Sequence, residues 1–369
     1  MKSPAWMRHL RLEISQQTED EAPAFVSGTR LQANECCVPW STRARALFAD
    51  VARTLEFNRY PEISSRGLRQ VIAIRHAIDI RQVVVGNGSA ELLGLLFGIC
   101  SGSRAPVAVV PVPTFAMFEE LGRAYGYEVR AVPLANDFDL DMPRMCSAVG
   151  GAALCVIARP NNPTGSVSSE HRVKCLIERF PETLFVIDEA YVDYWPDCSW
   201  LGKWTRVNQV HVRSLSKVGL AGLRIGYLVG PPEVVQAVDR LRAPYNVSSV
   251  TSAFAQVALT VLEDERQAMI RATVKEREKM RVVLQHLPGA TVYPSKANMF
   301  LVGFSHREQA CSLSCALARH NIYVRDASGD RGMRELGIAG CLRVGVGTAQ
   351  DTLRLQRAIA EIRGSDSLR

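Results

Sequence analysis

The lysine of the stretch "RSLSKVGLAGLR", residues 213–224, has the setting of a reactive amine. Lys217 follows two serines and precedes an apolar, glycine-rich run that carries no charge until Arg224. Such an amine is costly in apolar surroundings unless it has a chemical partner, and it can form a Schiff base with an aldehyde. Ser214, Ser216 and Arg224 add hydroxyl groups and a fixed cation, which suit a phosphate. Taken alone, the segment is equally compatible with a solvated loop.

A carboxylate, Asp188, ends the most apolar segment of the chain, "TLFVID" at 183–188. We expect this carboxylate to be partly buried, and a buried carboxylate needs a partner. One candidate partner is an arginine in a salt bridge. The other is the ring nitrogen of pyridoxal phosphate, a cofactor that also has an aldehyde for Lys217 and a phosphate. A carboxylate beside that nitrogen keeps it protonated, so that the ring acts as an electron sink.

Other side chains near predicted strand ends match the remaining parts of this cofactor. An amide and a phenol suit the ring oxygen, and Asn162 of "NNPTG" and Tyr191 of "DEAY" have these types. Phe115 of "PTF" offers an aromatic face to the ring. The "GNGS" turn offers backbone N–H groups to an anion at Ser89 and Ala90. Each motif has an ordinary structural explanation by itself, and only together do they favour the cofactor.

The elements that position these residues alternate between apolar strands and helices from about residue 68. We expect strands within 81–89, 105–115, 153–165, 183–194, 208–217 and 224–230. Continuous apolar strands separated by helices predict a mainly parallel α/β sheet that is buried on both faces. Ligands of such sheets bind at the loops beyond the strand ends, where Lys217 and Asp188 lie.

The pattern changes after Gly230. Residues 231–287 are rich in helix formers, and short strands then alternate with helices expected at 306–320 and 349–363. This pattern indicates a smaller α+β domain. The first 45 residues show little periodicity. We therefore predict an N-terminal arm and connector at 1–45, a large cofactor-binding domain at 46–265 and a small C-terminal domain at 266–369.

The composition excludes several classes of protein. The longest apolar run, at 92–100, is too short to span a membrane, and the N-terminus lacks a signal-peptide core, so we expect a cytoplasmic protein. The ten cysteines form no C-x-x-C pair and the seven histidines no H-x-x-x-H spacing, which predicts reduced thiols and no metal site. The net charge of +7 is spread along the chain and does not indicate a nucleic-acid partner.

The order of these motifs resembles that of the fold-type I pyridoxal-phosphate-dependent aminotransferases. The motifs are "GNGSAE", "PTF", "NNPTG", "IDEAY", "SLSK", "GLR" and "CLRVGVGT". More narrowly, the chain resembles the histidinol-phosphate aminotransferase family over about residues 31–363. The stretches that carry this narrower likeness are "ANE", "NRYPE", "PYNVSS", "SKANMFLV" and "YVRD".

The resemblance implies a role for each matching residue. Lys217 would hold pyridoxal phosphate and move the proton during catalysis, while Asp188 would pair with the ring nitrogen. The remaining cofactor contacts would come from Ser89, Ala90, Phe115, Asn162, Tyr191, Ser214, Ser216 and Arg224. Tyr60 of "NRYPE" would reach the cofactor phosphate of a partner subunit, which implies a homodimer. Arg343, Arg325 and Asn34 would bind the substrate. For both arginines the structural alternative is a surface position at a strand edge, and for Tyr60 it is a packing role.

The implied reaction transfers an amino group from histidinol phosphate to 2-oxoglutarate in two alternating halves. The chain departs from the family pattern in "ANECCVPW", in Ala90 and in the long segment 327–340, all on the substrate side. A second hypothesis therefore keeps the cofactor and changes the reaction, to an aromatic amino-acid aminotransferase, an amino-acid-phosphate decarboxylase or a tailoring enzyme of secondary metabolism. A third, a cofactor-binding regulator, would need a DNA-binding appendage, for which the first 45 residues are too short.

Overall fold

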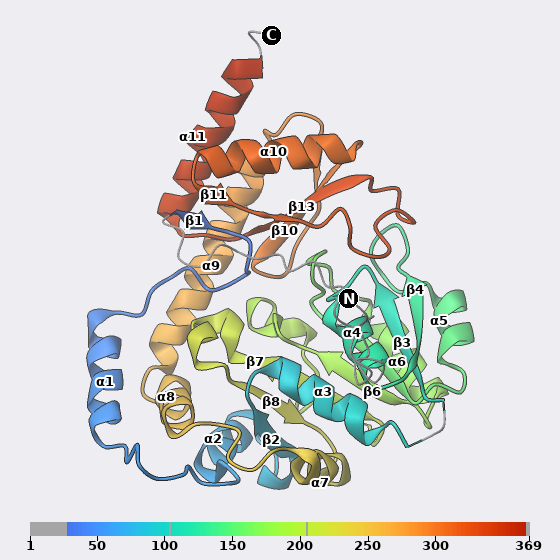
Figure 1. The fold of residues 1–369 in the computed structure, drawn as a ribbon, viewed down its shortest axis with the longest axis vertical. Coiled ribbons are helices and arrows are strands. Elements are labelled where there is room, and N and C mark those ends of the chain that lie inside the picture. Colours follow the sequence, from blue (N-terminus) through green and yellow to red (C-terminus); the bar gives the residue numbers. More distant parts are fainter. Residues whose placement is uncertain (1–27, 103–104, 204–205, 367–369) are drawn as a thin grey trace, which may run out of the picture.

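The computed structural model describes residues 28–102, 105–203 and 206–366 (Figure 1). At its centre is a seven-stranded sheet of order β2-β8-β7-β6-β5-β3-β4. The strands are β2 (Val83–Gly86), β3 (Val107–Val112), β4 (Glu128–Pro133), β5 (Leu154–Ala158), β6 (Leu184–Asp188), β7 (Gln209–Ser214) and β8 (Gly226–Val229). The strand β8 runs antiparallel to both of its neighbours, β2 and β7, and the other pairings in the sheet are parallel. The predicted mainly parallel α/β sheet is confirmed.

Helices cover both faces of this sheet, because its strands are apolar on both sides. In β5, Leu154 and Val156 belong to one buried cluster, whereas Cys155 and Ile157 belong to another. The first cluster also contains residues of α3 (Ser89–Ile99), α4 (Met117–Ala124) and α7 (Pro232–Leu241). The second contains residues of α5 (Met142–Val149) and α6 (Glu170–Arg179). The sheet is thus held between two helical layers, which leaves the strand ends as the places for a ligand.

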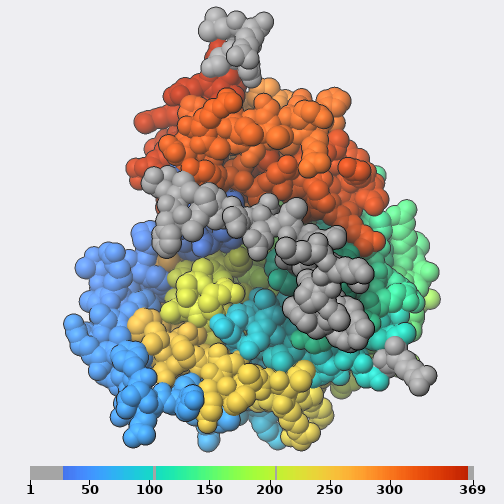
Figure 2. Space-filling view, in the orientation of Figure 1, coloured from blue at the N-terminus to red at the C-terminus, as the bar shows by residue number. Residues whose placement is uncertain are grey.

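A second sheet organises the C-terminal part of the chain, drawn in orange to red in Figure 1. It has the antiparallel order β12-β13-β10-β9. Its strands are β9 (Ala290–Val292), β10 (Met299–Phe304), β12 (Arg325–Asp326) and β13 (Gly340–Gly345). The helices α10 (Arg307–Arg319) and α11 (Ala349–Asp366) share a buried cluster with it. In the space-filling view this part packs directly against the part that contains the central sheet (Figure 2).

The beginning of the described chain joins the two parts. The short strand β1 (Thr29–Arg30) pairs in parallel with β11 (Ile322–Tyr323), beside which it is seen in Figure 1. Leu31 is buried in the core of the C-terminal part. The chain then continues into α1 (Thr42–Arg53) and α2 (Arg66–His76), which contact α8 (Ser249–Leu259) next to the central sheet. Of the predicted arm, residues 1–27 lie outside the described residues, and 42–45 already belong to a helix.

The region expected to be helical after Gly230 is divided among separate helices. Besides α7 these are α8 (Ser249–Leu259) and α9 (Glu263–Leu284). The break is at Thr260, whose φ of −123° and ψ of −86° are not helical. Three acidic residues in the first turn of α9 favour a new start there, because they face its positive end. None of the described helices combines the length and apolarity needed to cross a bilayer.

Short 3₁₀ turns complete the fold at the strand ends. They are η3 (Ile80–Gln82), η4 (Val192–Tyr194), η5 (Pro196–Cys198), η6 (Leu215–Val218) and η7 (Ala221–Leu223). The turns η4 and η5 follow β6, and η6 and η7 connect β7 to β8. They hold the segments that carry Tyr191 and Lys217.

Candidate active site

Two parallel strands bring the predicted carboxylate and the predicted amine to the same edge of the sheet. In the β6–β7 register Asp188 is opposite Val212, and β7 ends at Ser214, directly before the turn with Lys217. Asp188 is buried, and its Oδ1 accepts a hydrogen bond from the Ala190 backbone N–H at 2.9 Å. Burial raises the pKa of this carboxyl to about 6, with a further contribution from the Glu189 charge, while the Ala190 N–H and Lys217 oppose the shift.

A buried carboxylate with a raised pKa gains most from a cationic partner. The protonated ring nitrogen of pyridoxal phosphate is such a partner, and Asp188 fits it. The assignment of Asp188 to the cofactor therefore has support in the geometry as well as in the motif.

Lys217 lies close to the aromatic ring of Tyr191. Its Nζ is 5.7 Å from the ring centroid and donates a hydrogen bond to the carbonyl oxygen of Ala33 at 3.3 Å. The backbone carbonyl of Lys217 accepts a hydrogen bond from the Tyr194 hydroxyl. The lysine is partly buried, with its backbone held by one neighbour and its amine directed at the segment that contains Asn34.

The substrate-side residues meet in a buried group formed by three distant segments. Asn34 Nδ2 lies 3.3 Å from the Tyr191 hydroxyl, to which it donates. Arg343 of β13 donates through Nη1 to Asn162 Oδ1 at 3.0 Å and through Nη2 to the carbonyl of Gln32. Among the described residues, the buried side-chain oxygens of Gln32 and Asn34 have no hydrogen-bond donor. Buried acceptors of this kind are expected where a ligand supplies the missing donors.

The predicted phosphate residues converge at the beginning of α3. Gly88, with φ of +83°, precedes this helix, whose first backbone N–H groups at Ser89 and Ala90 have no side-chain cap. Arg224 Nη1 donates to Ser216 Oγ at 3.1 Å, and Ser214 Oγ accepts from the Ser216 backbone N–H. A Cβ on Gly88 would lie 2.8 Å from Arg224 Nη2. The guanidinium therefore lies directly against the glycine turn before α3, an arrangement that would suit a phosphate.

Phe115 lies in the loop after β3 and not in the strand. Its ring packs edge-on against Phe118 of α4, with the ring centroids 5.7 Å apart. The loop is tied to the "NNPTG" turn, because Thr114 donates to Asn161 Oδ1 at 2.7 Å and Asn161 Nδ2 donates to the Pro113 carbonyl at 2.8 Å. Asn161 is thus a positioning residue that the sequence analysis did not identify. Stacking of Phe115 on the cofactor stays a prediction.

Two of the predicted residues are not joined to this group. Tyr60 is 80% exposed and stacks on Tyr245, with ring centroids 4.6 Å apart. Arg325 is opposite Arg343 in the β12–β13 register, but its Nη2 forms an ion pair with Asp330 Oδ1 at 2.9 Å. Within one chain, Tyr60 has no part in the site, and Arg325 is partly neutralised.

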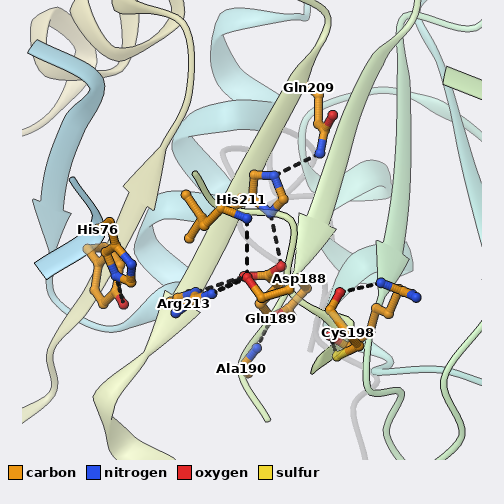
Figure 3. Close-up of polar contacts among 12 residues, drawn as sticks. His76, Asp188, Glu189, Ala190, Cys198, Gln209, His211 and Arg213 are labelled. Carbon is orange, nitrogen blue, oxygen red and sulfur yellow. Dashed lines mark hydrogen bonds and ion pairs between the residues drawn. The ribbon is translucent and has the colours of Figure 1, made fainter. Parts of the chain in front are cut away.

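A second buried polar group behind Asp188 was also missed (Figure 3). It consists of Glu189, His211 and Arg213, with Gln209 and Ser199 at its ends. The signal in the sequence was the alternation "QVHVRS", which places polar side chains along a buried strand. No cluster of His, Cys, Asp and Glu suited to a metal ion occurs within 28–102, 105–203 and 206–366.

Comparison with known proteins identifies the family. The model of aminotransferase class I and II matches residues 27–362. Histidinol-phosphate aminotransferase 2 of Nitrosococcus oceani is 32% identical over 338 residues, 89% of this chain and 90% of that relative. Histidinol-phosphate aminotransferase of Aquifex aeolicus is 31% identical over 351 residues, 95% of this chain and 96% of that relative.

The fold has close counterparts among solved structures. Histidinol-phosphate aminotransferase from Sinorhizobium meliloti, in complex with pyridoxal 5'-phosphate, aligns with a TM-score of 0.81 at 23% identity, over 95% of this chain and 99% of that one. The match to the family model extends over nearly all described residues and includes the Asp188, Lys217 and Arg224 positions. The chain therefore belongs to the aminotransferase class I and II family of pyridoxal-phosphate-dependent transaminases.

Proposed function

We propose that the protein is a histidinol-phosphate transaminase, which converts histidinol phosphate and 2-oxoglutarate to imidazole acetol phosphate and glutamate. The observation that carries this proposal is the buried guanidinium of Arg343, held between Asn162 Oδ1 and the Gln32 carbonyl. A guanidinium in this position can receive either a carboxylate or a phosphate, because its planar fork matches both oxyanions. The names of the relatives support the choice of donor.

When bound, pyridoxal phosphate supplies the reactive aldehyde and an electron sink. Lys217 would carry the proton between the substrate carbon and the cofactor carbon, because its Nζ lies beside the Tyr191 ring at the end of the site. Asp188 would hold the ring nitrogen in its protonated form. Tyr191 and Asn162 would donate to the ring oxygen, and Ser89, Ala90, Ser214, Ser216 and Arg224 would bind the phosphate.

The wider organisation of the enzyme is part of the same proposal. We keep the division into a large domain at 46–265 and a small domain at 266–369, with Arg343 reaching the site from the small one. Phe57, Tyr60, Ile63 and Tyr245 are all exposed, and such an apolar surface suits the interface of a homodimer. In that dimer Tyr60 would reach the cofactor phosphate of the partner subunit. We also propose a cytoplasmic location.

One observation favours a second candidate, an aromatic amino-acid aminotransferase. The ion pair between Arg325 and Asp330 reduces the positive charge available to a phosphate group on the substrate side. A donor with an uncharged aromatic end would need no such charge. If Asp330 stays paired during binding, the site would favour this donor over a phosphate ester.

The test follows the visible absorbance of the cofactor in the purified protein. Histidinol phosphate should abolish the band of the resting enzyme, and 2-oxoglutarate should restore it with formation of glutamate. A response to phenylalanine and none to histidinol phosphate would establish the second candidate. Release of carbon dioxide without glutamate would overturn transamination altogether.

A further inference from the structure

Glu189 is a buried carboxylate, next to Asp188 in the chain, with its own set of donors. Its Oε2 accepts from Arg213 Nε at 2.7 Å, and its Oε1 lies 3.1 Å from His211 Nδ1. Ser199 Oγ lies 3.4 Å from Oε2 and also accepts from Arg213 Nη2 at 2.6 Å. Burial by itself raises the pKa of Glu189, but the Arg213 guanidinium and His211 outweigh it and hold that pKa at about 2. Glu189 is therefore ionised, and the Arg213 guanidinium balances its negative charge.

Both ring nitrogens of His211 face polar side chains. Nδ1 lies 3.1 Å from Glu189 Oε1, and because a carboxylate can only accept, a hydrogen on Nδ1 would make this contact favourable. On the other side, Gln209 Nε2 lies 2.7 Å from His211 Nε2. The Gln209 amide can present either its nitrogen or its oxygen to Nε2. Figure 3 shows the resulting row of side chains from Gln209 through His211 to Glu189.

The position of Glu189 in the chain links this group to the cofactor residues. Side chains alternate across a strand, so Glu189 points to the opposite side from Asp188. The Glu189 backbone N–H donates to the Val212 carbonyl at 2.8 Å, and its carbonyl accepts from Val192 N–H at 3.1 Å. The turn from Asp188 to Tyr191 is therefore held to β7 by Glu189 through both its backbone and its side chain.

We propose that His211, through the 3.1 Å contact between its Nδ1 and Glu189 Oε1, is a positioning residue that holds Asp188 and Tyr191 at the two edges of the cofactor ring. His211 and Glu189 do not touch the cofactor themselves. Arg213 provides the charge that keeps Glu189 ionised, and His211 adds the directional contact from the neighbouring strand. This proposal depends on the cofactor assignment but not on the identity of the amino donor.

Two matched variants separate the two nitrogens of the ring. In His211→Asn the amide nitrogen takes the place of Nδ1 and keeps the donor to Glu189. In His211→Gln it takes the place of Nε2 and loses that donor. Both replace an imidazole by an amide. The measurement is the affinity of pyridoxal phosphate for the cofactor-free protein, with the melting temperature of the cofactor-free form as the control for folding.

We expect His211→Asn to bind the cofactor within about twofold of the wild type and His211→Gln about tenfold more weakly, because a hydrogen bond to a charged group is lost. The pH dependence of the visible band should move only in His211→Gln. Equal affinities in the two variants, or equal losses, would overturn the proposal. Should His211→Gln fail to fold, nitrogen NMR of His211 in the wild-type holoenzyme decides: a hydrogen on Nδ1 supports the positioning role, and a ring with its only hydrogen on Nε2 refutes it.

The outcome is independent of the proposed substrate. Cofactor affinity is measured without any donor, so a failure with histidinol phosphate leaves this test intact. Conversely, unchanged affinity in His211→Gln would remove His211 from the site while the transaminase proposal stands.

Discussion

Asp188 and Glu189 are consecutive carboxylates in opposite electrostatic states. Glu189 has an arginine and a histidine as partners, whereas Asp188 has one backbone N–H and the more distant charge of Lys217. At the scale of single residues, this contrast determines which carboxylate is available to a cofactor. Glu189, whose charge is paired within the protein, supports the turn. Asp188 lacks such a partner and would gain from a cation.

The raised pKa of Asp188 predicts a stability that depends on pH in the cofactor-free protein. Since the folded pKa of about 6 exceeds the ordinary 3.8, the native state holds a proton that the unfolded chain releases between these values. Stability therefore falls as pH rises from about 4 to about 6. Asp188→Asn should remove this loss and stabilise the cofactor-free protein by roughly 2–3 kcal/mol at pH 7.

The same substitution should lower turnover by at least about a hundredfold, because an amide cannot keep the ring nitrogen protonated. Urea unfolding at pH 4.5 and pH 7 measures the stability, and steady-state assays measure the turnover. If Asp188→Asn is less stable than the wild type at pH 7, the buried carboxylate is satisfied by the protein and is merely structural.

Lys217→Ala tests the amine directly. We expect loss of the visible band of the lysine-bound cofactor and turnover reduced to background, because the amine that would bind the aldehyde and carry the proton is removed. Arg224 and Ser216 should still retain the cofactor by its phosphate, which equilibrium dialysis would detect. Normal turnover in this variant would contradict the entire assignment of the site.

At the scale of elements, the segment 327–339 between β12 and β13 packs against the part of the molecule that contains the central sheet, next to the loop after β3. Met333 is fully buried in a cluster with residues of the central sheet. Arg331 forms an ion pair with Glu119 of α4 at 2.6 Å. A Cβ on Gly332 would lie 2.7 Å from Pro113 N, directly before Thr114 and Phe115. The length of this segment therefore has a packing reason.

Gly332→Ala should destabilise the protein by about 1–3 kcal/mol and weaken cofactor binding, because the new methyl group meets backbone at a φ of +90°. Two controls separate the causes. Gly337→Ala has a positive φ but no atom within 4 Å, and Gly329→Ala has neither obstacle. Thermal unfolding should rank Gly332→Ala as most destabilised and Gly329→Ala as nearly neutral. If Gly337→Ala destabilised the protein as much as Gly332→Ala, backbone strain alone would explain the loss of stability, and the contact with Pro113 would add nothing.

At the scale of the whole molecule, the exposure of Tyr60 is explained by the proposed dimer. Tyr60 and Tyr245 stack on each other at the surface, beside the exposed side chains of Phe57 and Ile63. Aromatic side chains are enriched at protein interfaces because one end is apolar and the other can hydrogen-bond. At such an interface the Tyr60 hydroxyl could reach the cofactor site of the partner subunit.

Mixed dimers test whether Tyr60 acts across the interface. If Lys217→Ala and Tyr60→Ala subunits are combined, each hybrid contains one site with both native residues. Activity should then recover to about a quarter of the wild-type level in a random mixture, although each parent is impaired. If Tyr60 serves its own chain, both sites of the hybrid are defective and no activity returns. Light scattering of each parent is the control for assembly.

The sequence by itself determined the mainly parallel sheet and supplied the candidate cofactor-binding residues. Apolar strands and their spacing are local patterns, and the carboxyl ends of parallel strands meet at one edge whatever the loops do. Asp188, Lys217, Ser216 and Arg224 could therefore be assigned from the motifs that follow each strand. The break inside the helical region was not predicted, since Thr260 has no proline or glycine beside it to mark the end of α8.

Only the tertiary structure decided the partners of the polar side chains. Arg343 meets Asn162 and Gln32 across three distant segments, and Arg325 is partly neutralised by Asp330 in the loop that follows it. The contact between His211 and Glu189 depends on the register of two neighbouring strands. Such contacts have no sequence period, because a hydrogen bond is short and directional and is set by how the chain folds back on itself.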